Sequence, residues 1–114
     1  MGMTACKMNS KKTISFFQHV YDLVQSIPAG KVTTYRHIAH TMNTKDARRV
    51  GHALHANSDS DKTPCHRVVF ADGRLAPGYV FGGPNEQMRR LQLEGVECID
   101  GRINLKKYLY IPKN

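Results

Sequence analysis

Two short helical patterns separated by only three residues occupy the centre of this chain. Thr34 is a suitable N-cap for a helix over residues 35–42, and Asp46 is a suitable N-cap for a helix over residues 47–56. The polar residues 43–45 provide the turn between them. Two short helices joined by a tight turn are typical of a helix-turn-helix, although many helical bundles also contain such a pair. The pattern therefore predicts a small, closely packed helical unit without assigning it a role.

One further helix is predicted on each side of this pair. Ser15 and Gln18 form a capping-box pair at the start of a helix over residues 16–26, where apolar residues recur at helical spacing. Pro84 suits the first position of a last helix, and Gly95 suits its stop.

Two β-hairpins are predicted in the second half of the chain, each around an Asp-Gly turn. Residues 67–75 contain the first hairpin and residues 96–105 the second, and residues 31–33 are expected to be extended. Helices followed by hairpins predict an α+β fold, a small winged helix-turn-helix domain that is mainly helical with short β-hairpins. We expect a basic N-terminal arm over residues 1–12 and a single domain over residues 13–114.

The charge balance favours a polyanionic partner. Seventeen Lys and Arg residues against nine Asp and Glu residues give a net charge of +8 on 114 residues. In so small a domain this favours nucleic acid, although a merely soluble basic protein would have the same charge. Without a long apolar run or an apolar signal region at the start, we expect no membrane insertion and no secretion, and a location in the cytoplasm, with the nucleoid, or in the nucleus.

The cysteines do not indicate a disulfide framework or a metal site. There are three of them, far apart and without a Cys-x-x-Cys pair: Cys6, Cys65 and Cys98. An odd number at such spacing favours a reducing compartment and no zinc. We expect neither a metal nor another cofactor.

The predicted helix over residues 47–56 carries a cationic stripe. Arg48, His52 and His55 fall on one side of it, and Gly51 keeps it slim enough for a close approach by another backbone. A slim cationic helix suits a DNA groove, and an ordinary solvated helix face fits the same pattern.

Residues 64–67 read Pro-Cys-His-Arg and place a thiol beside an imidazole. The thiolate is the reactive form of cysteine, and a neighbouring histidine or arginine favours it by lowering the thiol pKa. The alternative is a structural cysteine, because free cysteine is among the residues most often buried.

Residues 64–68, Pro-Cys-His-Arg-Val, match in full the core motif of the O6-alkylguanine-DNA alkyltransferases. From about Phe16 to the end of the last predicted helix, the chain resembles the DNA-binding and catalytic domain of that family, which has shorter relatives, the alkyltransferase-like proteins. The resemblance implies that Cys65 accepts the alkyl group of O6-alkylguanine, irreversibly and once per molecule.

The resemblance also implies roles for four residues around Cys65. His66 would relay the thiol proton through water and would be held by Glu94. Asn57, eight positions before the cysteine, would tie the recognition helix to the active-site turn. Tyr79 would protonate the departing guanine at N3.

Further roles implied by the resemblance concern DNA and the extruded base. Arg48 would enter the base stack as a finger, Tyr35 would turn the 3′ phosphate of the target nucleotide, and the Val68 carbonyl would read the guanine amino group. Tyr35 could instead cap the core. The expected DNA-binding residues are Arg48, Tyr35, Thr34, Arg49, Gly51 and His52, and the expected substrate-pocket residues are Pro64, Val68, Tyr79, Val80 and Phe81.

The chain departs from the family pattern in two ways. The larger members carry an extra N-terminal domain, in some with a zinc site, which has no counterpart here. Residues 78–83 read Gly-Tyr-Val-Phe-Gly-Gly where the family commonly has Gly-Tyr-Ser-Gly-Gly, so the loop is one residue longer and lacks the serine that would bond guanine O6. Phe81 could stack on the flipped base or admit a bulkier alkyl group.

Three functions follow from these patterns. The first is a DNA-repair alkyltransferase, favoured by Cys65 because alkyltransferase-like proteins usually replace that cysteine, often with tryptophan. The second, favoured by the short length and the altered loop, is a lesion sensor that flips the base and recruits other repair proteins. The third is a winged-helix transcription regulator. Such a protein would not need Cys65, His66, Asn57 and Glu94 at the spacing found in the family.

The expected partner is double-stranded DNA containing O6-alkylguanine, bound by a monomer.

Overall fold

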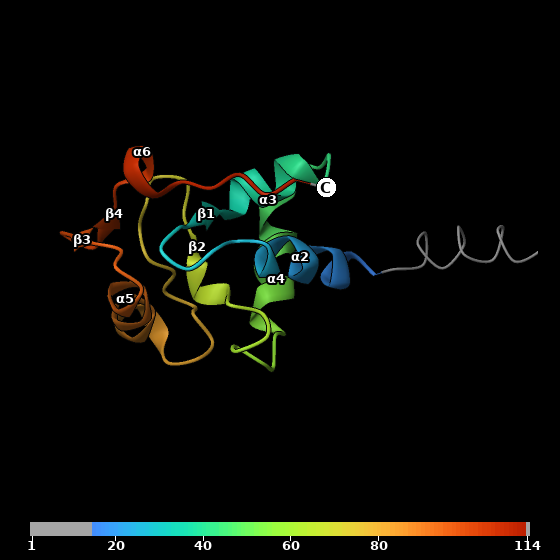
Figure 1. Cartoon of the computed structure of the whole chain (residues 1–114). Coiled ribbons are helices and arrows are strands. Elements are labelled where there is room, and N and C mark those ends of the chain that lie inside the picture. The colour runs from blue at the N-terminus through green and yellow to red at the C-terminus, as the bar shows by residue number, and fades with distance from the viewer. Residues whose placement is uncertain (1–14, 114) are drawn as a thin grey trace, which may run out of the picture.

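Short helices and two-residue strands make up the described part of the chain, residues 15–113, in a computed structural model (Figure 1). The predicted basic arm over residues 1–12 lies outside the described residues. In chain order the elements are α2 (Phe16–Gln25), β1 (Thr33–Thr34), α3 (Tyr35–Thr41), α4 (Ala47–His55), a 3₁₀ turn (Cys65–Arg67), β2 (Val68–Val69), α5 (Gly83–Leu93), β3 (Cys98–Ile99), β4 (Arg102–Ile103) and α6 (Leu105–Tyr108).

Helices α2, α3 and α4 begin where the capping residues predict. The Ser15 hydroxyl accepts a hydrogen bond from the Gln18 amide, and the Thr34 hydroxyl accepts one from the His37 amide. The Asp46 carboxylate caps α4 in the same way. Each cap satisfies a backbone N–H that has no partner inside its helix, so these local bonds set the three helix starts.

Helices α3 and α4 form the predicted helix-turn-helix, and together with α2 they make up one helical unit. Helix α4 packs against both α2 and α3, and the buried side chains Val24, Ile38 and Val50 belong to one apolar cluster between them. Figure 1 shows this unit on one side of the molecule, with α5 and the β3–β4 pair on the other side.

The first predicted hairpin is wrong in its strand pairing. The turn itself forms, because the Phe70 amide donates to the Arg74 carbonyl at 2.9 Å. Strand β2, however, pairs in parallel with β1, with Thr33 opposite Val68. Residues after the turn pair with β4 instead, through a bridge between Arg74 and Arg102. The turn signal is local, whereas the edge of β2 is taken by a strand that comes from the helix-turn-helix.

The C-terminal part contains the second predicted hairpin and one helix that was not predicted. Strands β3 and β4 pair antiparallel, which confirms that hairpin. Helix α6 follows directly, with the Asn104 side chain accepting from the Lys106 amide. The chain then returns to the helix-turn-helix, where the Tyr110 amide donates to the Val32 carbonyl at 2.7 Å. Within residues 15–113, no helix has the length and apolar character needed to cross a membrane.

Candidate nucleic-acid interface and cysteine pocket

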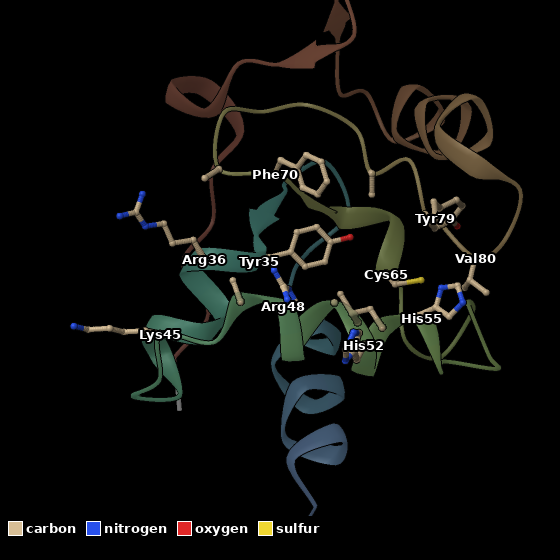
Figure 2. A pocket seen from close by; sticks show the side chains of 16 residues that line it. Tyr35, Arg36, Lys45, Arg48, His52, His55, Cys65, Phe70, Tyr79 and Val80 are labelled. Atoms are coloured by element: carbon tan, nitrogen blue, oxygen red, sulfur yellow. The ribbon is translucent and has the colours of Figure 1, made fainter.

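A cavity of about 670 Å³ lies between the helix-turn-helix and the loop that precedes α5 (Figure 2). Helix α4 forms its floor, and the Cys65 sulfur lies at one end of it. Its wall is largely apolar and aromatic, and its rim is basic. The lining residues that the sequence patterns indicate are Tyr35, Arg48, Gly51, His52, His55, Cys65, Tyr79 and Val80.

Cys65 sits at the start of the 3₁₀ turn and is held by Asn57. The Asn57 amide donates to the Thr63 carbonyl at 2.9 Å and lies 3.5 Å from the Cys65 sulfur. Asn57 lies two residues after the end of α4, so it joins the second helix of the helix-turn-helix to the cysteine turn. The Cys65 residue is 4% exposed, and the cavity gives its sulfur access to a ligand.

The environment of Cys65 does not favour the thiolate in the way the sequence predicts. Burial raises the pKa of the Cys65 thiol, and this outweighs the hydrogen bond from Asn57 and the positive charge of Arg90, which lower it. Arg67, the arginine of the motif, does not act on the sulfur. Its guanidinium is bound by Glu94 and by the Ile27 carbonyl. The expectation that Arg67 activates the thiol is therefore wrong.

His66 and Glu94 form a partly buried pair next to the cysteine. His66 Nε2 lies 2.9 Å from Glu94 Oε2, and a carboxylate can only accept, so Nε2 carries the proton. His66 Nδ1 is then an acceptor, and it is buried with no hydrogen-bond partner among residues 15–113. Burial lowers the pKa of His66 despite the opposing effect of Glu94. Burial alone would raise the pKa of Glu94, but hydrogen bonds from Arg67 and His66 lower it overall.

A buried glutamine that the sequence does not predict as a site residue fixes the backbone around this pair. Gln87 on α5 is fully buried; its amide donates to the carbonyls of His66 and Val68, and its oxygen accepts from the Ala76 amide. Nothing in the local sequence distinguishes it from a surface glutamine. Val68 and Pro64, both predicted for the pocket, are buried and do not line the cavity. The Val68 carbonyl already accepts from Gln87 at 2.8 Å.

The structure places the predicted DNA-binding residues in two groups. Tyr35 and Arg48 line the cavity with Gly51 and His52, and Figure 2 shows the Tyr35 hydroxyl directed toward Cys65. Thr34 is fully buried and holds the start of α3. The Arg49 guanidinium stacks 4.1 Å from the Phe16 ring centroid, and Arg49 does not line the cavity.

The loop before α5 contributes Tyr79 and Val80 to the cavity. Phe81 does not line it, and packs against Tyr79 with ring centroids 5.9 Å apart. The Tyr79 hydroxyl oxygen accepts from Arg90 at 2.9 Å. Burial raises the pKa of Tyr79 to about 12, so the phenol keeps its proton at neutral pH.

Two basic side chains on the rim were not predicted as site residues. Arg36 on α3 and Lys45 in the turn line the cavity, and Figure 2 shows them extending away from its Cys65 end. Both are exposed. Their position in the helix-turn-helix was the available signal, because the start of the first helix and the turn flank the groove-facing helix in such units. Phe70 and Ala71, from the turn after β2, complete the opposite wall.

The fold and the site together describe a helix-turn-helix domain with a cysteine at the end of a cavity beside its second helix. Residues 15–96 match the family described as "6-O-methylguanine DNA methyltransferase, DNA binding domain". The chain belongs to this family.

Relatives in the family differ in length and in the names they carry. The chain is 35% identical over 103 residues to alkyltransferase-like protein 1 of Schizosaccharomyces pombe, with 85% of this chain and 95% of that protein covered. It is 39% identical over 100 residues to a bifunctional methyltransferase/endonuclease of Picrophilus torridus, with 87% of this chain and 33% of that protein covered. The chain thus spans about a third of the second relative.

A solved structure shows the same fold. The crystal structure of S. pombe Atl1 in complex with damaged DNA containing O6-carboxymethylguanine matches with a TM-score of 0.76 and 35% identity. The match covers 85% of this chain and 95% of that one. The predicted α+β class and the helix-turn-helix are therefore confirmed, whereas the roles of individual site residues stay predictions.

Proposed function

We propose that this protein binds alkylated double-stranded DNA, takes an O6-alkylguanine into the cavity and transfers the alkyl group to Cys65. The observation that carries the proposal is the position of the Cys65 sulfur at the end of a cavity of about 670 Å³ that opens beside α4. A cysteine at the end of such a cavity can meet a base only if that base has left the stack. The protein would act where the chromosome is, in the cytoplasm with the nucleoid or in the nucleus.

The chemistry is a displacement at a saturated carbon. The sulfur–carbon bond forms as the bond from carbon to guanine O6 breaks. The thiol proton passes through a water molecule to His66 Nδ1, the buried acceptor, while Glu94 stabilises the resulting imidazolium at Nε2. The departing guanine takes a proton from Tyr79, which is protonated at neutral pH. The product is a thioether, so each molecule acts once.

Proton removal is needed because the thiol is not pre-ionised. Burial raises the pKa of Cys65, so most of the protein carries a neutral thiol at neutral pH. A base that acts in the transition state avoids the need for a stable thiolate. This is the part of the mechanism in which His66 and Glu94 are required.

The binding step uses the basic rim and α4. Arg36, Lys45 and Arg48 are exposed cations on the cavity. Contacts from such side chains to phosphates position DNA without reading its sequence. Arg48 would fill the space left by the extruded base, and Tyr35 would press on the phosphate next to it.

A second function, a lesion sensor without transfer, is favoured by a specific observation. The chain is 35% identical to the alkyltransferase-like protein of S. pombe, and the structure of that protein in complex with damaged DNA matches with a TM-score of 0.76. Such a protein would bind and flip the lesion in the same cavity and recruit other repair proteins.

A mass measurement separates the two functions. The protein is incubated with a duplex that contains one O6-methylguanine, then digested, and the peptides with Cys65 and with Cys98 are weighed. We expect one added methyl group on the Cys65 peptide and none on the Cys98 peptide, which is the internal control. Tight binding of the lesion duplex with an unchanged Cys65 peptide would reject transfer and establish the sensor.

A further inference from the structure

The loop that departs from the family pattern is held by one arginine of α5. Arg90 donates from Nη1 to the Tyr79 hydroxyl oxygen at 2.9 Å, and its guanidinium lies 5.7 Å from the Tyr79 ring centroid and 5.8 Å from the Phe81 ring centroid. Tyr79 and Phe81 themselves meet edge to face. One side chain therefore contacts the two aromatic residues on either side of Val80.

Arg90 is itself fixed by a carboxylate one helical turn earlier. Its Nε lies 2.9 Å from Glu86 Oε2, an i,i+4 pair on α5. The start of α5 is tied to the same loop, because the Gly83 amide donates to the Tyr79 carbonyl at 2.9 Å. The arginine, its carboxylate partner and the loop thus form one connected unit behind the cavity wall.

The neighbouring arginine makes the same ion pair without the loop contacts. Arg89 binds Glu86 through Nε at 2.9 Å and Nη2 at 2.6 Å, and its side chain is 60% exposed. The Arg90 side chain is 28% exposed. An arginine needed only to pair with Glu86 would resemble Arg89, so the loop contacts of Arg90 require a separate explanation.

We propose that Arg90 is a positioning residue that fixes the Tyr79–Phe81 loop as a wall of the cavity and orients the Tyr79 hydroxyl as a donor to the bound base. An arginine has no acceptor, so in its bond with Tyr79 it must be the donor. The tyrosine proton is then free for another acceptor. Cation–π contacts with both rings restrict the loop further. This inference names a residue for the function proposed above and rests on it.

The mechanism of Arg90 is testable by comparing it with Arg89. Arg90→Met removes the hydrogen bond and the charge, whereas Arg89→Met removes a pair with the same Glu86 and is the matched control. Arg90→Lys keeps a charge and a donor. Tyr79→Phe removes only the hydroxyl, and the Tyr79→Phe/Arg90→Met double variant shows whether the two residues act together. The readouts are the rate of methyl gain on Cys65 at saturating protein, the affinities for lesion and undamaged duplexes, and the melting temperature.

We expect Arg90→Met to lower the transfer rate about tenfold, the effect of losing one charge-assisted hydrogen bond, and Arg89→Met to leave it within about twofold. Arg90→Lys should recover at least half of the lost rate on a logarithmic scale. The double variant should lose less rate than the product of the two single losses, because Arg90 acts in part through the Tyr79 hydroxyl. Equal rates for the two arginine variants, or multiplied losses in the double variant, would overturn the proposal.

The test also separates this inference from the proposed transfer. If the wild-type protein gains no methyl group, transfer fails, and Arg90 is judged by the ratio of affinities for lesion and undamaged duplexes. That ratio should fall in Arg90→Met and stay constant in Arg89→Met. If Arg90→Met unfolds, Tyr79→Phe and Arg90→Lys carry the comparison, and wild-type behaviour in both would reject the inference.

Discussion

Arg67 binds Glu94 through two parallel hydrogen bonds, from Nε to Oε1 at 3.0 Å and from Nη2 to Oε2 at 2.6 Å. Glu94 Oε2 also accepts from His66, so one carboxylate joins the arginine and the histidine of the Pro-Cys-His-Arg motif. A fork-shaped pair of this kind fixes the orientation of the carboxylate as well as its charge. Arg67 thus serves the cysteine indirectly, by holding the group that orients His66.

Replacing Arg67 by Ala should therefore destabilise the fold. The change leaves Glu94 partly buried without its main partner and also frees the Ile27 carbonyl, which accepts from Arg67 at 2.8 Å. We expect a loss of about 2–4 kcal/mol in the free energy of unfolding, measured by urea denaturation. Arg74→Ala, which removes an exposed pair with Asp72, is the control and should cost less than about 1 kcal/mol. Equal losses would show that the Arg67–Glu94 pair is not special.

The stability of the protein should depend on pH through His66. Burial lowers the pKa of His66 below its ordinary value of 6.5, so the unfolded chain takes up this proton before the folded protein does. The stability that neutral His66 contributes is complete above pH 6.5 and is lost as the pH falls below that value. The free energy of unfolding then falls by at most about 1.4 kcal/mol per pH unit, the limit for one proton.

The His66→Gln variant isolates this contribution from that of other groups, such as His37, whose pKa is also lowered. The difference in free energy of unfolding between wild type and His66→Gln should fall as the pH is lowered from about 7.5 to 5. Because the pKa of Glu94 is lowered, the Glu94 carboxylate stays ionised in the folded protein over this pH range. Its titration therefore does not contribute to the difference between wild type and His66→Gln. A difference that is constant with pH would contradict the burial of a neutral His66.

Arg48→Ala should weaken lesion binding more than general DNA binding. Arg48 lies beside the cavity that would take the extruded base, so it is placed to fill the gap left in the duplex, whereas a phosphate contact alone would act on all DNA equally. We expect a loss of about tenfold for a duplex with O6-methylguanine and about two- to threefold for the matched undamaged duplex, by fluorescence anisotropy. Arg49→Ala on the same helix is the control, because Arg49 stacks on Phe16 outside the cavity. Equal losses on both duplexes for Arg48→Ala would reject the finger role.

Salt should weaken binding steeply, and the rim cations should account for part of the slope. For each side chain that contacts a phosphate, the slope of log affinity against log salt changes by about 0.9. The Arg36→Ala/Lys45→Ala double variant should therefore show a shallower slope than wild type. A Lys106→Ala/Lys113→Ala double variant removes two exposed charges that do not line the cavity, and its slope should stay closer to that of the wild type. An unchanged slope in the Arg36→Ala/Lys45→Ala variant would mean that DNA does not bind at this rim of the cavity.

Gly73 should be intolerant of a side chain. Its φ is +87°, and an added Cβ would overlap the Ile103 carbonyl oxygen. Gly101 also has positive φ, +75°, but faces open space. We expect Gly101→Ala to cost about 1 kcal/mol of unfolding free energy and Gly73→Ala clearly more, because the overlap adds to the backbone strain. Urea denaturation measures both losses of unfolding free energy. Equal losses for Gly73→Ala and Gly101→Ala would mean that the 70–74 turn can move away from β4.

The sequence predicts the elements whose signals are local. Ser15, Thr34 and Asp46 cap the helices they were expected to cap, since a cap depends on only three or four neighbouring residues. The Asp-Gly turn at Asp72 and Gly73 forms for the same reason. The pairing of β2 with β1 was not predictable in this way, because it joins Thr33 to Val68 across 35 positions of the chain.

The candidate site was predictable in its chemistry and less so in its geometry. Cys65 lies on the cavity and the His66–Glu94 pair forms as the motif implies. The function of Arg67 was misread, because a neighbour in sequence need not be a neighbour in space. Gln87 was missed because its burial depends on how α5 packs over the cysteine turn.

The parallel pairing of β1 with β2 has a mechanical consequence. Strand β1 leads into α3, and strand β2 follows the Cys65–Arg67 turn. The pairing of Thr33 with Val68 therefore joins the helix-turn-helix to the turn that holds Cys65. Because this strand pair joins α3 to the Cys65 turn, a shift of α3 on binding of a duplex would also displace the Cys65 sulfur.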